Sequence, residues 1–182
     1  MSKIRFVERC NMRFEESKKI NGLVVIHPNV FYDHRGENVQ TFSSIEMLEM
    51  LNKLNLPKLT FNVDSFSFSK KDVLRGFHGD AKAWKLVQCI QGSIQLVVID
   101  LREGETKDKV ETFYLNERNR TQILIPSGCV NAHLCLSETC IFSYKLSDTY
   151  VPIEQQLHVK WNDPKYNVFW PVKEPIVSKR DS

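Results

Sequence analysis

The chain has 182 residues, of which 42% are hydrophobic and 26% are charged. These proportions are ordinary for a soluble globular protein that buries a core, so we expect one domain over residues 1–182. The net charge of +3 is too small to indicate nucleic-acid binding, and no apolar run reaches the roughly 20 residues of a membrane span.

The N-terminal third contains one predicted helix. Residues 1–20 are charged and weakly patterned, which indicates an N-terminal arm or an edge strand. Residues 22–26 read as a strand, and residues 33–36 read as a turn. Residues 43–46 resemble a helix start, and apolar residues continue at helical spacing until Pro57.

From about residue 59 the pattern changes to short strands between turn signals. We expect strands in the runs 61–67, 85–90, 94–100, 111–115, 122–125, 133–136 and 140–146. The turns at 91–93 and 137–139 predict hairpins between the strands that flank them. The tail is rich in Pro and Trp and is expected to pack onto the strands. This pattern is typical of an all-β sandwich or barrel with one or two short helices and an irregular C-terminal tail.

The cysteines indicate a reducing environment. There are five, none in a CxxC pair, and Cys89, Cys135 and Cys140 lie in apolar runs. We therefore expect buried free thiols rather than disulfides. The N-terminal segment also lacks the apolar core of a signal peptide. Together these features predict a cytoplasmic protein.

The segment that contains Arg75, Gly76 and His78 is the first candidate site. Side chains three residues apart on a strand point to opposite faces. A glycine between them permits a bulge that re-aims one side chain into a common cavity. An arginine that binds an anion, beside a histidine that transfers a proton, suits an anionic substrate.

Two other residue types have alternative interpretations. Tyr144 lies in a buried-looking strand, where it would either fill the core or donate a proton into a cavity. Lys85 and Lys145 would normally face water, but Lys85 follows Trp84 and precedes an apolar run, which allows one inward-facing cation. The histidines form no HxH or HExxH motif, so their spacing predicts no metal site.

The chain resembles the dTDP-4-dehydrorhamnose 3,5-epimerase family from about residue 22 to residue 181. The resemblance rests on ordered blocks: DHRG (33–36), VLRGFH (73–78), KLV (85–87), VIDLR (98–102), IPSG (125–128), FSYK (142–145), WND (161–163) and PIVSKRD (175–181). It implies a cupin jelly roll, a double-stranded β-helix sandwich. It also implies an isomerase that inverts carbons beside the 4-keto group of a nucleotide-diphosphate sugar, without a cofactor, in surface polysaccharide biosynthesis.

The resemblance also implies residue roles. His78 corresponds to the catalytic base, Asp181 to the carboxylate that orients it, Tyr144 to the opposing acid, and Lys85 to the lysine near the sugar's carbonyl oxygen. The implied substrate-binding residues are Arg35, Arg75, Asn131, His133, Ser65, Gln40 and Asp100. Of these, the two arginines correspond to phosphate ligands. The family forms homodimers in which an N-terminal strand crosses to the partner sheet, and Arg35 would then serve the partner's site.

The chain departs from the family pattern around the substrate. Asn131 stands where the family has a histidine, and His133 lies two residues later. Val63 and Ser65 replace Gln and Asn, and residues 37–40 replace an aromatic run and Glu. These departures leave open which nucleotide base and which sugar the substrate carries. The LRGFHGD and NAH blocks look more like a branch that acts on GDP-linked 4-keto-heptoses in capsule synthesis.

Two alternatives to an epimerase remain at this stage. A related cupin would move the keto group between C3 and C4 of a nucleotide sugar. A catalytically silent cupin would only bind a sugar, and the loss of a family histidine at Asn131 is compatible with that function. The retained base, orienting carboxylate and acid favour the epimerase.

Overall fold

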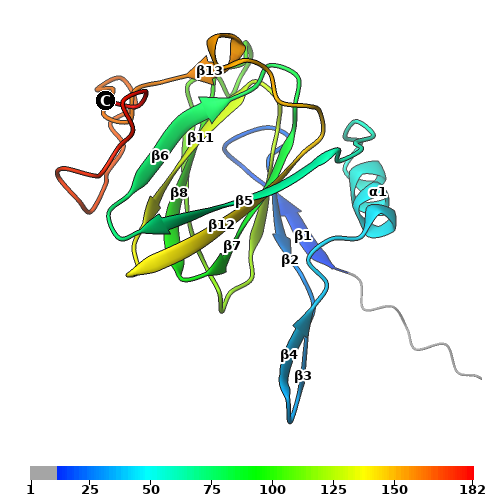
Figure 1. Cartoon of the computed structure of the whole chain (residues 1–182). Coiled ribbons are helices and arrows are strands. Elements are labelled where there is room, and N and C mark those ends of the chain that lie inside the picture. The colour runs from blue at the N-terminus through cyan, green and yellow to red at the C-terminus, as the bar shows by residue number, and fades with distance from the viewer. Residues whose placement is uncertain (1–11) are drawn as a thin grey trace, which may run out of the picture.

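Two antiparallel sheets make up most of the computed structural model, which describes residues 12–182. Residues 1–11 of the expected N-terminal arm lie outside the described residues. In the described part, one sheet has the order β1 (Arg13–Glu16), β2 (Val24–His27), β10 (Gln122–Ile125), β7 (Lys85–Gln91), β12 (Thr139–Leu146) and β5 (Val63–Lys70). The other has the order β13 (Leu157–His158), β6 (Leu74–Gly79), β11 (Cys129–Cys135), β8 (Ser93–Asp100) and β9 (Val110–Asn116). Figure 1 shows the two sheets packed as a sandwich, which confirms the predicted all-β jelly roll.

The β8 strand shows why the sequence folds into two layers. Leu96 and Val98 join the cluster between the sheets, where they meet Val87 of β7 and Ile123 of β10. Alternate residues point to opposite faces, so the intervening Val97 contacts a second cluster instead. Because both faces of β8 are covered, the strand is buried nearly throughout, and its residues 96–99 form a continuous apolar run.

The C-terminal tail covers the outer face of the second sheet, as expected. Trp161 and Trp170 pack in the cluster that contains Phe77 of β6 and Val97 of β8. The Trp170 indole donates its Nε1–H to the carbonyl of Trp161 at 3.1 Å, which satisfies the buried polar atom. The tail therefore brings the last residues of the chain back to β6 (Figure 1).

The predicted helix is present as α1 (Ser44–Lys53), and a 3₁₀ turn follows later as η1 (Ile153–Gln155). The Ser43 hydroxyl accepts a hydrogen bond from the amide of Glu46, a standard N-cap. Met47, Met50 and Leu51 are buried on one side of the helix against the first sheet. Among residues 12–182, no helix is long and apolar enough to cross a membrane.

The expected turn at residues 33–36 closes a separate hairpin. Strands β3 (Val30–Asp33) and β4 (Gly36–Val39) pair with each other and project from the body of the protein (Figure 1). Arg35 lies in its turn, where its amide and guanidinium both donate to the carboxylate of Asp33. The hairpin carries exposed Phe31 and Tyr32.

The two hairpins predicted in the second half are wrong. The β7 strand pairs with β10 and β12, whereas β8 pairs with β11 and β9, so the turn at 91–93 crosses between sheets. The turn at 137–139 crosses in the same way between β11 and β12. The two crossings pack together: the Ser93 amide donates to the Ser137 hydroxyl at 2.9 Å. A tight turn between apolar runs does not reveal which sheet the second strand joins.

The cysteines are free thiols where the structure describes them. Cys89, Cys129, Cys135 and Cys140 are all buried and unpaired, as expected, and Cys10 lies outside the described residues. Burial raises the pKa of both Cys89 and Cys129 to about 12. These thiols are therefore protonated and unreactive at neutral pH.

Candidate active site

A bulge in β6 places Arg75 and His78 on one cavity. His78 pairs with Asn131, but Arg75 pairs with His133, so three steps along β6 match two along β11. At the bulge Gly76 has φ = +122°, and a Cβ there would lie 2.5 Å from the carbonyl oxygen of Asn131. Glycine is thus required both by its dihedral angle and by the close approach of β11. The bulge expected from the sequence is confirmed.

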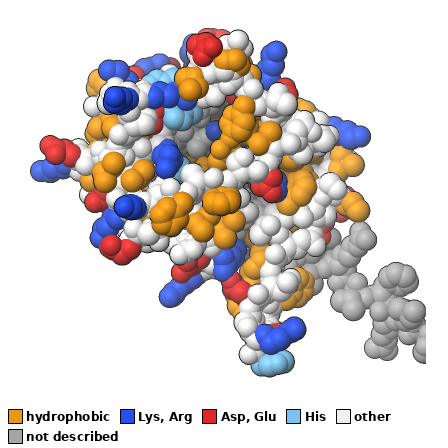
Figure 2. Space-filling view, viewed as in Figure 1, with side chains coloured by type: hydrophobic (Ala, Val, Ile, Leu, Met, Phe, Trp, Pro, Cys, Tyr) orange, Lys and Arg blue, Asp and Glu red, His pale blue; other side chains and the backbone are white. Residues whose placement is uncertain are grey.

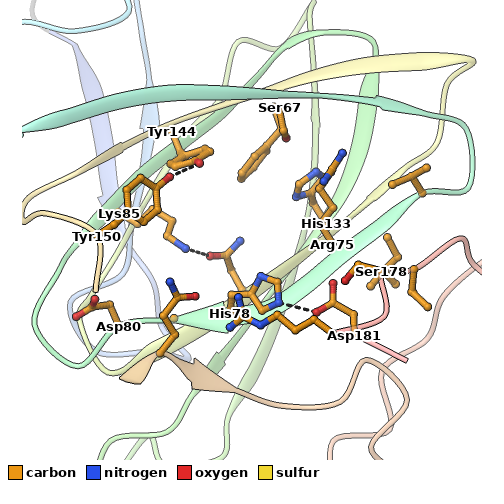
Figure 3. A pocket seen from close by; sticks show the side chains of 18 of the residues that line it. Ser67, Arg75, His78, Asp80, Lys85, His133, Tyr144, Tyr150, Ser178 and Asp181 are labelled. Atoms are coloured by element: carbon orange, nitrogen blue, oxygen red, sulfur yellow. Dashed lines mark hydrogen bonds and ion pairs between the residues drawn. The ribbon is translucent and has the colours of Figure 1, made fainter. Parts of the chain in front are cut away.

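The cavity has a volume of about 650 Å³, within the usual range for small-molecule sites. It lies between the sheets and is bordered by β5, β6, β7, β11 and β12 and by the tail (Figure 3). Seven of the sequence-predicted residues line it: His78, Tyr144, Asp181, Lys85, Arg75, Asn131 and His133. Figure 2 shows its hollowed mouth on the face that carries β5 and β12.

His78 and Asp181 form a hydrogen-bonded pair at one side of the cavity. The His78 Nε2 atom lies 2.6 Å from Oδ1 of Asp181, whose side chain is only 2% exposed. Burial lowers the pKa of His78, and the hydrogen bond to Asp181 raises it by a smaller amount. A neutral imidazole that donates Nε2–H to the carboxylate keeps its lone pair on Nδ1, so it can accept a proton there.

Lys85 supplies a positive charge to the same cavity. Its Nζ donates to Oδ1 of Asn131 at 2.8 Å. Burial lowers the pKa of Lys85 to about 8, and the charge of Asp80 opposes that shift. The lysine is therefore mostly protonated at pH 7, and Asn131 holds its ammonium without neutralising it. An ammonium held this way stabilises negative charge that develops on a nearby oxygen.

Two tyrosines lie on another side of the cavity. The hydroxyl of Tyr150 donates to the hydroxyl of Tyr144 (Figure 3). Burial raises the pKa of Tyr150, as does its hydrogen bond with Tyr144. Because Tyr144 accepts this bond, its own proton remains available for another acceptor.

His133 is deeply buried in the cavity wall. Its ring stacks on Phe142 with 4.0 Å between centroids, the residue is 3% exposed, and Nε2 has no hydrogen-bond partner. Burial lowers the pKa of His133 to about 3, with a further contribution from the charge of Arg75. His133 is therefore neutral at physiological pH, and its Nε2 is free to form a hydrogen bond with a ligand.

Two arginines give this region a positive character. Arg75 donates from Nε to the Ser69 hydroxyl at 3.0 Å and from Nη2 to the Phe68 carbonyl at 3.2 Å. These bonds fix the guanidinium and leave its other donors free. Arg180 also lines the cavity, and its buried Nη2 has no partner. Both side chains suit an anionic ligand.

Four sequence-predicted residues do not line the cavity. Arg35 is exposed at the tip of the β3–β4 hairpin. Gln40 donates from Nε2 to Glu46 at 3.0 Å, next to α1. Asp100 is fully buried and paired with Arg102 and Thr106, where it braces the end of β8. Ser65 does not line the cavity, but it interacts with Tyr150, which does, and lowers the pKa of that tyrosine.

The sequence analysis missed several cavity residues, among them Ser67, Tyr150, Gln156 and Arg180. The alternation of Ser65 and Ser67 on β5 was a usable signal, because residues two apart share a face. Arg180 directly precedes Asp181 in the tail block. Tyr150 lies after β12 in a segment without periodicity, so nothing local predicted it.

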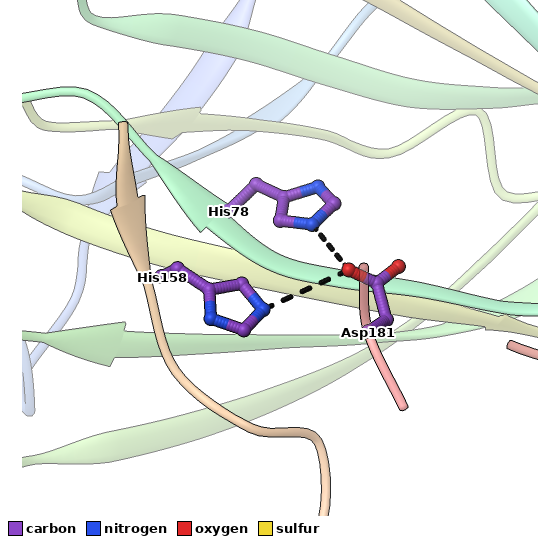
Figure 4. A group of neighbouring side chains, drawn as sticks. All are labelled: His78, His158 and Asp181. Carbon is purple, nitrogen blue, oxygen red and sulfur yellow. Dashed lines mark hydrogen bonds and ion pairs between the residues drawn. The ribbon is translucent and has the colours of Figure 1, made fainter. Parts of the chain in front are cut away.

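The structure also places beside His78 and Asp181 a histidine that the sequence analysis did not use. His158 of β13 pairs in register with His78 of β6, and its Nε2 lies 3.7 Å from Oδ1 of Asp181. Figure 4 shows both imidazoles directed at the same carboxylate oxygen.

Comparisons with known proteins identify the family. The sequence model of the family described as dTDP-4-dehydrorhamnose 3,5-epimerase matches residues 17–182. The dTDP-4-dehydrorhamnose 3,5-epimerase of Methanothermobacter thermautotrophicus is 33% identical over 168 residues, which cover 89% of this chain and 88% of that protein.

Solved structures agree with this assignment. The Elizabethkingia anophelis dTDP-4-dehydrorhamnose 3,5-epimerase superposes with a TM-score of 0.83 at 32% identity, covering 94% of this chain and 93% of that one. The dTDP-6-deoxy-D-glucose-3,5-epimerase of Legionella pneumophila, solved in complex with dTDP-4-keto-L-rhamnose, gives a TM-score of 0.85 at 30% identity, covering 93% of this chain and 89% of that one. The chain therefore belongs to the dTDP-4-dehydrorhamnose 3,5-epimerase family of isomerases.

Proposed function

We propose that this protein, acting as one domain, inverts C3, C5 or both in a nucleotide-linked 4-keto sugar by acid–base chemistry through an enolate. The observation that carries the proposal is the His78–Asp181 pair, which shares one cavity with Lys85 and Tyr144. These residues supply a base, a site for developing charge and a proton donor. The reaction would need no cofactor.

The proposed mechanism begins with proton removal. A C–H bond beside a ketone is acidic because the resulting anion spreads onto the carbonyl oxygen. His78 takes this proton on Nδ1, and Asp181 stabilises the imidazolium through Nε2–H. The ammonium of Lys85 stabilises the charge that develops on the oxygen. After Tyr144 has reprotonated the carbon, the imidazolium of His78 releases its proton to solvent and the Tyr144 phenolate takes one from solvent, which restores both residues.

Inversion requires that the proton return to the opposite face of the carbon. Tyr144 is the proposed donor, because its hydroxyl accepts from Tyr150 and keeps its own proton free. The base and the donor come from different sheets, His78 from β6 and Tyr144 from β12. A sugar ring held between the sheets would therefore meet them from two sides.

The substrate that best fits the family is a dTDP-4-keto-6-deoxyhexose, since the relatives and the Legionella complex carry that chemistry in their names. The diphosphate would meet Arg75 and Arg180. A GDP-4-keto-heptose is the second candidate. It is favoured by Asn131 and His133, which alter the polar groups offered to the sugar, and would fit a role in surface or capsular polysaccharide synthesis.

A direct comparison of substrates tests this proposal. The protein would be incubated with dTDP-4-keto-6-deoxyglucose and, separately, with GDP-4-keto-6-deoxy-heptose, and the products analysed by NMR. We expect inverted configuration at C3 or C5 with one of them. A product whose keto group has moved to C3 would instead identify a ketoisomerase. Binding without any conversion of either sugar would support a catalytically silent cupin.

The proposed assembly is a homodimer with N-terminal strand exchange. Within the described residues, β1 pairs with β2 of its own chain and forms one edge of its sheet, so its outer side is free for another strand. The β5 edge carries exposed Phe66 and Phe68, and the projecting hairpin carries Arg35. Light scattering would give the oligomeric state, and Arg35→Gln should weaken nucleotide binding if the hairpin reaches the partner's cavity.

A further inference from the structure

Three possible metal ligands converge beside the cavity. His78, His158 and Asp181 each offer one ligand atom, and these atoms lie within 4.8 Å of one another. Two imidazoles and one carboxylate are a common ligand set for zinc sites that keep a fourth position open. The spacing rules applied to the sequence missed this group, because its members come from β6, β13 and the tail.

The positions of these ligands are close to those that zinc needs. Ligand atoms around tetrahedral zinc are about 3.3 Å apart, as follows from bonds of about 2.0–2.2 Å. Nε2 of His158 is already 3.7 Å from Oδ1 of Asp181, while Nε2 of His78 is nearer, at 2.6 Å. Only a small separation of His78 from Asp181 and a small approach of His158 would be needed.

His158 is well placed to make that movement. It lies in the two-residue strand β13 at the edge of its sheet, and its side chain is 31% exposed. Asp181 is fixed by comparison, since the Gly76 amide donates to its other oxygen, Oδ2, at 3.4 Å. The cavity would leave room for water at the open position of the ion.

We propose that His78, His158 and Asp181 form a binding site for Zn²⁺ or a similar late transition-metal ion, and that the bound ion switches the proposed base off. The second part rests on the proposed function, whereas the first part does not. Oxygen-preferring ions such as Mg²⁺ should not bind, because two of the three ligands are imidazoles.

The switch follows from the single proton of neutral imidazole. Without the ion, Nε2 of His78 carries this proton and Nδ1 has the lone pair that would accept the substrate's proton. A metal ion takes the Nε2 lone pair instead, so the proton must move to Nδ1. No proton is gained or lost overall, but His78 has no lone pair left for catalysis. Asp181 is simultaneously withdrawn from its hydrogen bond.

Zinc titration of the full chain tests the site without depending on activity. Calorimetry would use the Cys10→Ser protein as the background, so that this thiol cannot bind zinc. The zinc affinity of the background protein would be compared with that of the same protein carrying His158→Gln or His34→Gln. His34 lies on the projecting hairpin and is the matched control. We expect one Zn²⁺ per chain and at least about 10-fold weaker binding after His158→Gln only. Equal affinities in the three proteins would overturn the site.

The switch is tested with the same proteins in the epimerisation assay. Zinc should inhibit the background protein, a chelator should restore it, and His158→Gln should be active and resistant to zinc. Zinc binding at His158 without inhibition would overturn the switch and leave the site standing. If neither sugar is converted, the proposed function fails but calorimetry and anomalous diffraction from zinc-soaked crystals still decide the site.

Discussion

Nε2 of His78 lies 2.6 Å from Oδ1 of Asp181, although 103 residues separate the two in the chain. The tail makes this possible by packing Trp161 and Trp170 against β6. The resulting pair is shielded, because Asp181 is 2% exposed. A base and its orienting carboxylate are therefore assembled by the packing of the tail.

The bulge at Gly76 should be essential for positioning Arg75 and His78. We expect Gly76→Ala to lower the free energy of unfolding by about 1–3 kcal/mol more than Gly104→Ala. Both glycines have positive φ, but an added Cβ meets the backbone of β11 at Gly76 and nothing within 4 Å at Gly104. Urea denaturation measures the difference. Equal effects would mean that the close approach of the strands does not matter.

The pH dependence of kcat/KM should have two limbs. Activity should fall below pH 6.5, as the imidazole of His78 with its lowered pKa becomes protonated. It should also fall as the pH rises through about 8, because Lys85 then loses its charge. In Lys85→Gln we expect a rate about 10²–10³-fold lower and no limb near pH 8. A basic limb unchanged in that variant would exclude Lys85 as its source.

His133 should make the protein sensitive to acid. Its folded-state pKa of about 3 lies below the ordinary value of 6.5, so the unfolded chain binds more protons between these values. The free energy of unfolding should therefore decrease as the pH falls through this window, by about 2 kcal/mol for His133 between pH 6.5 and 5.

Replacement of the ring isolates this contribution. His133→Phe retains an aromatic stack on Phe142 and cannot titrate, and the lost Nε2 has no partner in the cavity wall. Denaturation at several pH values should give a shallower slope for this variant, whereas His34→Asn on the hairpin should match the parent. Parallel slopes in all three proteins would show that His133 does not titrate on unfolding.

Tyr144→Phe should separate proton removal from inversion. Without its hydroxyl the donor is lost, but His78 can still remove a proton, exchange it with the deuterated solvent and return a deuteron to the same face. We expect solvent deuterium to enter the substrate while inversion slows by about 10²-fold or more. Tyr150→Phe is the control, because Tyr144 retains its hydroxyl. NMR follows both events, and a parallel loss of exchange and inversion would contradict the role of a separate donor.

Local patterns predicted those features that depend on neighbouring residues. The helix cap at Ser43 and the bulge at Gly76 both follow from short stretches of sequence, and both are confirmed. The hairpins predicted at 91–93 and 137–139 were wrong because strand pairing depends on distant partners.

The candidate site likewise contains some residues that the sequence predicted and others that only the fold brings to it. Seven residues were placed on the cavity through the resemblance to the family, whereas Gln40 and Asp100 were inferred in the same way but make contacts elsewhere. His158 gave no sequence signal, because it is a single histidine in a two-residue strand. Its proximity to Asp181 arises only from the pairing of β13 with β6 and the return of the tail.

Solvent deuterium exchange in His78→Asn is the most direct test of the central claim. With the preferred 4-keto sugar in deuterated water, the parent protein should incorporate deuterium at C3 or C5. His78→Asn should reduce that incorporation by about 10²–10⁴-fold, because asparagine cannot accept the proton. Circular dichroism would verify that the variant is folded. Exchange at the parental rate in a folded His78→Asn protein would contradict the assignment of His78 as the base.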